Sequence, residues 1–134
     1  MGAVKTDVNA KERTLESKYL ALDNPAGVRM LLGDYHALTE RQYAGDYDAV
    51  VILVDLATAI ERAGLTGRQA EALDCVFIED LTQVETANRL GCSKQTVNRL
   101  TSVAIAKIAR VYEKWARYGE GYSLGGDNYG EEIV

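Results

Sequence analysis

The stretch from Thr82 to Tyr118 constrains the fold more than any other part of the chain. Thr82 followed by Glu85 is a capping-box pattern, in which a hydroxyl and a carboxylate each satisfy a free backbone N–H, so a helix begins at Gln83. Gly91 can take the left-handed conformation that ends a helix. Ser93 can then cap a second helix that begins at Lys94. The pattern therefore predicts two helices joined by a tight turn.

The spacing of small and apolar residues in this stretch is typical of a helix-turn-helix. Such a pair crosses at roughly 90 to 120°, which requires a small side chain at the contact, a turn residue without Cβ strain and apolar residues that point back. Ala87, Gly91, Val97 and Leu100 fill these positions. Cys92 occupies a turn position that suits a small hydrophobic side chain. The stretch is thus predicted to be a DNA-reading unit.

Polar side chains lie on the outer side of the second helix, over its first two turns. Arg and Lys recognise guanine, Gln and Asn recognise adenine, and Thr bonds to either. In helix-turn-helix proteins the N-terminal part of the second helix enters the major groove. A solvated helix face is the alternative interpretation. The side chains concerned are Lys94, Gln95, Thr96, Asn98 and Arg99.

Length and charge are compatible with this interpretation. The chain has 134 residues, of which 47% are hydrophobic and 26% charged, as expected for one globular domain with a small appendage. Its net charge is -5, yet seven basic residues between Thr86 and Tyr118 face only one acidic residue, Glu113. A basic segment between two acidic ones suits a nucleic-acid partner.

Several functional classes lack support in the sequence. The apolar run from Ala49 to Val54 is too short to span a membrane, and no signal peptide is visible, so we expect a cytoplasmic protein. Cys75 and Cys92 are not spaced for a disulfide framework or a zinc site. His36 is the only histidine, and no phosphate-binding loop pattern occurs. We therefore expect neither enzymatic activity nor a metal or cofactor.

The N-terminal half is predicted to be helical. Leu15 to Leu22 could form two turns, and apolar spacing predicts a helix from Ala26 to about Tyr43, which a break near Gly33 could interrupt. Asp46 can cap a helix that runs to about Ala63. The run VVILV within it would also suit a buried strand, but the helical period continues beyond it. Its wide apolar surface predicts packing against a second chain.

Two further helices and a tail complete the expected architecture. Thr66 can cap a helix that ends at Glu79–Asp80, just before the Thr82 cap. The helix from Lys94 could reach Tyr118, roughly 37 Å in length. Its predicted apolar stripe is Val97, Leu100, Ala104, Ile108, Val111 and Trp115. A neighbouring ridge, which could contact phosphates or be a solvated face, is Lys107, Arg110, Lys114 and Arg117. The glycine-rich, acidic segment 119–134 is predicted to be a flexible tail.

The segment LTGRQAEALDCVFIEDLTQVETANRLGCSKQTVNRLTSVAIAKI, residues 65–108, resembles region 4 of the sigma-70 family of bacterial RNA polymerase sigma factors. In the family pattern, Leu-Thr precedes a first helix, and Asp-Leu-Thr precedes a second helix that ends in Arg-Leu-Gly. A small apolar residue and Ser then precede the recognition helix, which ends in Ala-x-x-Lys-Ile. This chain has all of these features. Thr86 and Val84 depart from the pattern, which usually has an apolar residue and a carboxylate at these places. Nothing in the N-terminal half resembles region 2, so a complete sigma factor is not expected. Small stand-alone sigma-like regulators of phages and mobile elements are the nearest analogue.

The resemblance implies where DNA would be contacted. Lys94, Gln95 and Arg99 lie where the family reads the −35 promoter element, and Thr82 and Arg89 lie near phosphates. The full set of predicted DNA-binding residues is Thr82, Gln83, Arg89, Ser93, Lys94, Gln95, Thr96, Asn98 and Arg99.

Three functions remain open at this point. The first is a sequence-specific DNA-binding transcriptional regulator that acts on double-stranded DNA, with a dimer favoured. The second is a small terminase-like oligomer for packaging phage DNA, and the third is a module that binds RNA polymerase. The expected organisation is an all-α helical bundle: a packing and dimerisation segment over residues 1–64, a helix-turn-helix domain over 65–118 with a long final helix, and the tail over 119–134.

Overall fold

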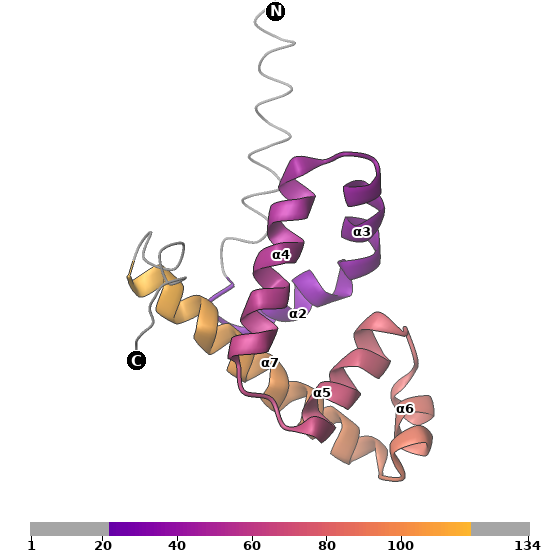
Figure 1. Cartoon of the computed structure of the whole chain (residues 1–134). Coiled ribbons are helices and arrows are strands. Elements are labelled where there is room, and N and C mark those ends of the chain that lie inside the picture. The colour runs from indigo at the N-terminus through magenta and orange to yellow at the C-terminus, as the bar shows by residue number, and fades with distance from the viewer. Residues whose placement is uncertain (1–21, 119–134) are drawn as a thin grey trace, which may run out of the picture.

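The computed structural model describes residues 22–118, which form an all-α structure without a strand in that range (Figure 1). The all-α prediction is confirmed. The predicted helix over 15–22 and the predicted tail over 119–134 fall largely or entirely outside the described residues. The elements are α2 (Pro25–Gly33), α3 (Tyr35–Tyr43), α4 (Tyr47–Arg62), α5 (Gly67–Leu73), the π-helical turn η1 (Asp74–Ile78), α6 (Gln83–Leu90) and α7 (Lys94–Arg117).

The helix predicted from Ala26 to Tyr43 is divided into α2 and α3 near the expected break. Asn24 caps α2 by accepting a bond from the Gly27 N–H at 3.1 Å, and Pro25 takes the first helical position, where its missing N–H costs nothing. At the break, the N–H of Asp34 bonds back to carbonyls of α2, and α3 starts at the next residue. The chain can therefore change direction between the two short helices.

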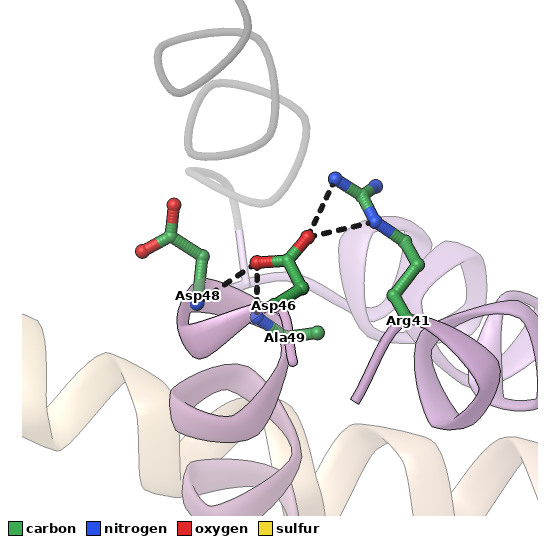
Figure 2. Close-up of polar contacts among 4 residues, drawn as sticks. All are labelled: Arg41, Asp46, Asp48 and Ala49. Atoms are coloured by element: carbon green, nitrogen blue, oxygen red, sulfur yellow. Dashed lines mark hydrogen bonds and ion pairs between the residues drawn. The ribbon is translucent and has the colours of Figure 1, made fainter. Parts of the chain in front are cut away.

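Asp46 starts α4 and settles the ambiguity of the VVILV run in favour of a helix. Figure 2 shows one carboxylate oxygen accepting from the N–H groups of Asp48 and Ala49, at 3.0 and 3.3 Å. The other oxygen binds the guanidinium of Arg41, with Nε at 3.0 Å and Nη2 at 2.9 Å. Asp46 thus caps α4 and ties it to the end of α3.

The long helix α7 is the element on which the others pack. In Figure 1, α5 and α6 lie beside its N-terminal half, and α2 and α4 lie beside its C-terminal half. One hydrophobic core draws on both groups of helices. Its buried members include Leu31, Leu32, Leu38, Leu56, Leu73, Ile105 and Ile108.

The buried face of α7 is centred differently from the predicted stripe. Val97, Ala104 and Ile108 are buried as predicted, whereas Leu100, Val111 and Trp115 are only half-buried. The other buried residues of α7 are Thr101, Ile105, Ala109 and Tyr112, which the predicted stripe did not include. The cause is tertiary: α7 packs against α5 and α6 along its N-terminal half and against α2 and α4 along its C-terminal half, so its buried face is wider than a single seam.

The connection from α5 to α6 contains a feature that sequence patterns did not predict. Thr66 caps α5 with a full capping box, but the helix then widens into the π-helical turn η1. The turn closes when the N–H of Leu81 bonds the carbonyl of Cys75 at 2.8 Å, with Asp80 in the left-handed region at φ 61°. This compact closure sets the position at which α6 begins.

Between residues 22 and 118, no helix combines the length and the apolar character that crossing a membrane requires.

Candidate DNA-binding site

The two helices of the predicted motif, α6 and α7, begin and end where the sequence indicated. Thr82 Oγ1 accepts from the Glu85 N–H at 3.0 Å, and Glu85 Oε1 accepts from the Thr82 N–H at 2.9 Å. Gly91 takes the left-handed conformation, with φ 68°, and the following N–H of Cys92 bonds the Ala87 carbonyl at 3.0 Å. These bonds satisfy both ends of α6, so its direction relative to the turn is fixed.

Buried side chains hold the motif together from behind. Thr86 and Val97 are fully buried, and Ala87 is nearly so. Val84 instead points to solvent, with 53% of its surface exposed. Thr86 therefore occupies the inward position at which the sigma pattern has an apolar residue, and the departure at Val84 falls on the outer surface.

Four polar side chains over the first two turns of α7 are exposed and unengaged. Lys94, Gln95, Asn98 and Arg99 all lie on the surface, and their side chains make no hydrogen bond or ion pair with another residue of 22–118. Each belongs to a type that can recognise a base edge. The N-terminal end of α7 thus presents four exposed polar side chains on a helix that is packed from behind.

The remaining predicted residues of the motif have local structural roles. Ser93 Oγ caps α7 by accepting from the Thr96 N–H at 3.1 Å, and it also bonds the Thr96 hydroxyl at 2.9 Å. Thr82 caps α6, and Gln83 is half-buried in its first turn. Thr96 is half-buried as well, so it is less accessible than its neighbours. The Ser93 cap therefore fixes the backbone of the α7 turns that carry the four exposed side chains.

Arg89 is bound within the chain. Its guanidinium forms an ion pair with Glu79, which lies just after η1, and both side chains are about half exposed. The hydrogen bond and the charge of Glu79 raise the pKa of Arg89 above its usual value. A phosphate contact by Arg89 would therefore compete with Glu79.

The ammonium of Lys107 is bonded within the protein, although the sequence placed this residue on the basic ridge that could contact phosphates. Its Nζ donates to Gln69 Oε1 at 2.9 Å and to the Gly64 carbonyl at 3.4 Å. It thereby joins α7 to the end of α4 and the start of α5. The sequence could not indicate this role, because the partners lie some forty residues away in the chain.

Metal ligands do not gather in the described part of the chain: no group of three or more His, Cys, Asp or Glu side chains is suitably placed there. Cys75 is buried and Cys92 half-buried, and both are free thiols.

A comparison with known families decides the nature of the motif. Residues 63–110 match the family described as sigma-70, region 4. These residues form a sigma-70 region 4-like helix-turn-helix domain. The region 4 domain starts at the end of α4 and includes α5, α6 and most of α7, so α2 and α3 lie outside it. Neither a curated protein nor a solved structure matches the chain.

The family assignment makes this domain a DNA-binding helix-turn-helix, in agreement with the resemblance. The roles of individual side chains in DNA contact stay predictions. Two cationic residues that bear on the domain were not predicted from the sequence. Arg68 reaches the Leu90 carbonyl at the end of α6, and Arg29 of α2 reaches Ser102 of α7.

Proposed function

We propose that this protein is a sequence-specific DNA-binding transcriptional regulator, rather than an enzyme, that acts in the cytoplasm. The observation that carries the proposal is the exposed, unengaged set Lys94, Gln95, Asn98 and Arg99 at the free end of α7. The region 4 domain supports the choice of double-stranded DNA as the ligand. The first turns of α7 would lie in a major groove.

The proposed contacts divide into two kinds. The exposed side chains of α7 read base edges, with Arg99 or Lys94 suited to guanine and Gln95 or Asn98 suited to adenine. Thr82 and Arg89 contact phosphates, which fix the register of the protein on the duplex without reading sequence. Ser93 acts indirectly, because its cap sets the backbone of the reading turns.

The proposal is tested by selecting DNA from a random pool with the purified protein and then measuring affinity for the selected site. Arg99→Ala should lose about 1 to 3 kcal/mol and relax specificity at one base position. The matched control is Arg110→Ala, which removes the same charge from the same helix roughly 16 Å farther along. A selection without sequence enrichment, or equal effects of both variants on selected and random DNA, would contradict the proposal.

We further propose that the protein is a dimer formed through α4. Tyr47, Val51 and Val54 lie along one face of this helix and are 75%, 39% and 57% exposed. An apolar stripe of this kind on a helix surface is suited to a protein interface. Two copies would present two reading helices to half-sites separated by one helical turn of DNA or a multiple of it.

Two other functions are outcomes of the same experiments. A ring of many subunits would favour a terminase-like packaging role over gene regulation. Binding to RNA polymerase without binding to DNA would favour an interaction module. The region 4 domain makes RNA polymerase a candidate partner.

A further inference from the structure

A cation from the N-terminal helices lies beside the DNA-reading helix. Arg29 belongs to α2, outside the region 4 domain. Its Nη2 donates to Ser102 Oγ of α7 at 3.5 Å, although the two residues are 73 positions apart in the sequence. The fold, not the motif, therefore brings this guanidinium to α7.

Ser102 lies on the same face of α7 as the proposed base readers. It follows Asn98 by four residues and Arg99 by three, and such residues are neighbours on a helix surface. It also follows Gln95 by seven residues, which is close to two full turns. Arg29 is thus placed along the reading face, just beyond its last base-reading residue.

The distance along α7 suits a phosphate contact. Ser102 lies roughly 12 Å along the helix from Lys94 at 1.5 Å per residue. The major groove is only about 8.5 Å deep, so a helix that enters by its N-terminal end emerges before Ser102. A side chain at this level would face the sugar-phosphate strand at the rim of the groove.

Arg29 is an exposed residue, and its guanidinium forms no ion pair with a carboxylate within residues 22–118. Arg41, Arg89 and Arg117, by contrast, each pair with an acidic side chain. The partner of Arg29 is a neutral hydroxyl, so a phosphate would not have to displace an anion. Val28 and Leu31 are fully buried on the same helix and hold its backbone in place.

Arg29 also lies beside a part of α7 that has no free basic side chain of its own. Between Arg99 and Arg110 the sole basic residue of this helix is Lys107, which is bonded to Gly64 and Gln69. The intervening residues on the outer side, Ser102, Val103 and Ala106, are uncharged. A cation in this gap comes from α2 instead.

We propose that Arg29 is a phosphate-contacting residue, through which the N-terminal helices complete the DNA-binding surface of the region 4 domain. This inference rests on the proposed DNA-binding function. A phosphate contact contributes affinity and orientation but carries no sequence information. Its signature is therefore an equal loss on all DNA sequences together with a weaker salt dependence.

The test measures affinity by fluorescence anisotropy for a random-sequence duplex and for a selected duplex, each over a range of salt concentrations. Arg29→Ala should weaken both by roughly fivefold to tenfold near 0.1 M salt and reduce the slope of log K against log[salt] by about one. Arg29→Lys, which retains the charge, should retain most of that slope. Arg41→Ala is the matched control, because it removes an exposed arginine from the same N-terminal helices and changes the net charge equally.

The outcomes separate this inference from the function on which it rests. If Arg29→Ala binds like Arg41→Ala while Arg99→Ala loses specific binding, Arg29 makes no contact but the proposed function stands. If neither Arg29→Ala nor Arg99→Ala changes binding, the proposed function itself fails. Thermal unfolding of each variant accompanies the titrations, and Arg29→Gln replaces Arg29→Ala should the latter be less stable.

Discussion

At the scale of single residues, Thr86 is the least expected feature of the helix-turn-helix. Its side chain on α6 is fully buried, and its Oγ1 has no hydrogen-bond partner among the described residues. A buried hydroxyl without a partner costs about 1 to 3 kcal/mol in protein mutational series. The hydroxyl therefore lowers the stability of the helix-turn-helix.

Thr86→Val should stabilise the protein, because valine has a similar shape and removes the unpaired hydroxyl. We expect the free energy of unfolding to rise by about 1 kcal/mol, measured by urea denaturation. Thr101→Val is the control. Thr101 is similarly buried, but its Oγ1 donates hydrogen bonds to the carbonyl oxygens of Val97, at 3.1 Å, and Asn98, at 3.0 Å. A gain at Thr101 as large as that at Thr86 would contradict this explanation.

Asp55 on α4 should make stability depend on pH. Burial raises its pKa above the ordinary 3.8, so the folded state binds a proton more readily than the unfolded state. The stability that Asp55 contributes is fully present below pH 3.8 and is lost as pH rises through the higher folded pKa. Asp55→Asn should therefore raise the melting temperature at neutral pH and have little effect below pH 3.8. A gain that is the same at both pH values would show that titration is not its cause.

At the scale of elements, the turn between α6 and α7 depends on one backbone conformation. Gly91 has φ 68°, and a Cβ built there would meet no atom within 4 Å. A larger residue would thus be opposed by backbone strain and not by a steric clash with its surroundings.

Gly91→Ala should lower the free energy of unfolding by about 1 to 2 kcal/mol, the cost of a left-handed alanine. Gly67→Ala is the matched control, since its Cβ also meets nothing within 4 Å but its φ lies outside the strained range. That control should be neutral or slightly stabilising. Chemical denaturation of both variants distinguishes strain from any general intolerance of alanine.

The ion pair between the end of η1 and α6 should restrain Arg89. Glu79→Gln frees the guanidinium, and if Arg89 contacts phosphate, affinity for DNA should rise by roughly twofold to tenfold. The pair is exposed to solvent, so the stability of the protein should change little.

Glu113→Gln provides the control for Glu79→Gln. It frees Arg117 at the far end of α7 and removes the same negative charge. Equal gains in DNA affinity from the two variants would indicate a general effect of net charge and remove the reason for placing Arg89 at a phosphate.

At the scale of the whole molecule, the exposed face of α4 bears on the oligomeric state. Val54→Glu should convert the proposed dimer to a monomer, because it places a charge in an apolar interface. Light scattering measures the mass directly. Val84→Glu is the matched control, since this valine of α6 is similarly exposed at 53%. A monomeric unmodified protein at high concentration would refute the α4 dimer.

The local features of this fold were predictable from the sequence, and the long-range ones were not. Thr66, Thr82 and Ser93 start their helices as expected, because a cap acts on N–H groups two or three residues away. The break before Tyr35 and the glycine stop at Gly91 are local in the same sense. The exposure of Lys94, Gln95, Asn98 and Arg99 is also a local feature, because it follows from their positions in the motif.

The positions of Lys107, Arg29 and Thr86 could not be predicted in the same way. The bonds of Lys107 and Arg29 join segments that are far apart in the sequence, so they depend on how α2, α4 and α5 pack on α7. The burial of Thr86 depends on the packing of α6 on α7. The π-helical turn η1 likewise results from joining α5 to α6 in a fixed arrangement. The type of each of these residues is compatible with several roles, and tertiary packing determines which role it has.

A single uninterrupted helix of 24 residues, α7, carries the proposed base-reading side chains at its N-terminal end and core residues that pack with α2 and α4 towards its C-terminal end. Because the helix is continuous, its two ends are expected to move together as one rigid element. If the protein binds DNA as the proposed dimer, the orientation of each α7 helix on the duplex would follow from the contacts made by α2 and α4, and the distance between half-sites would be fixed by those contacts.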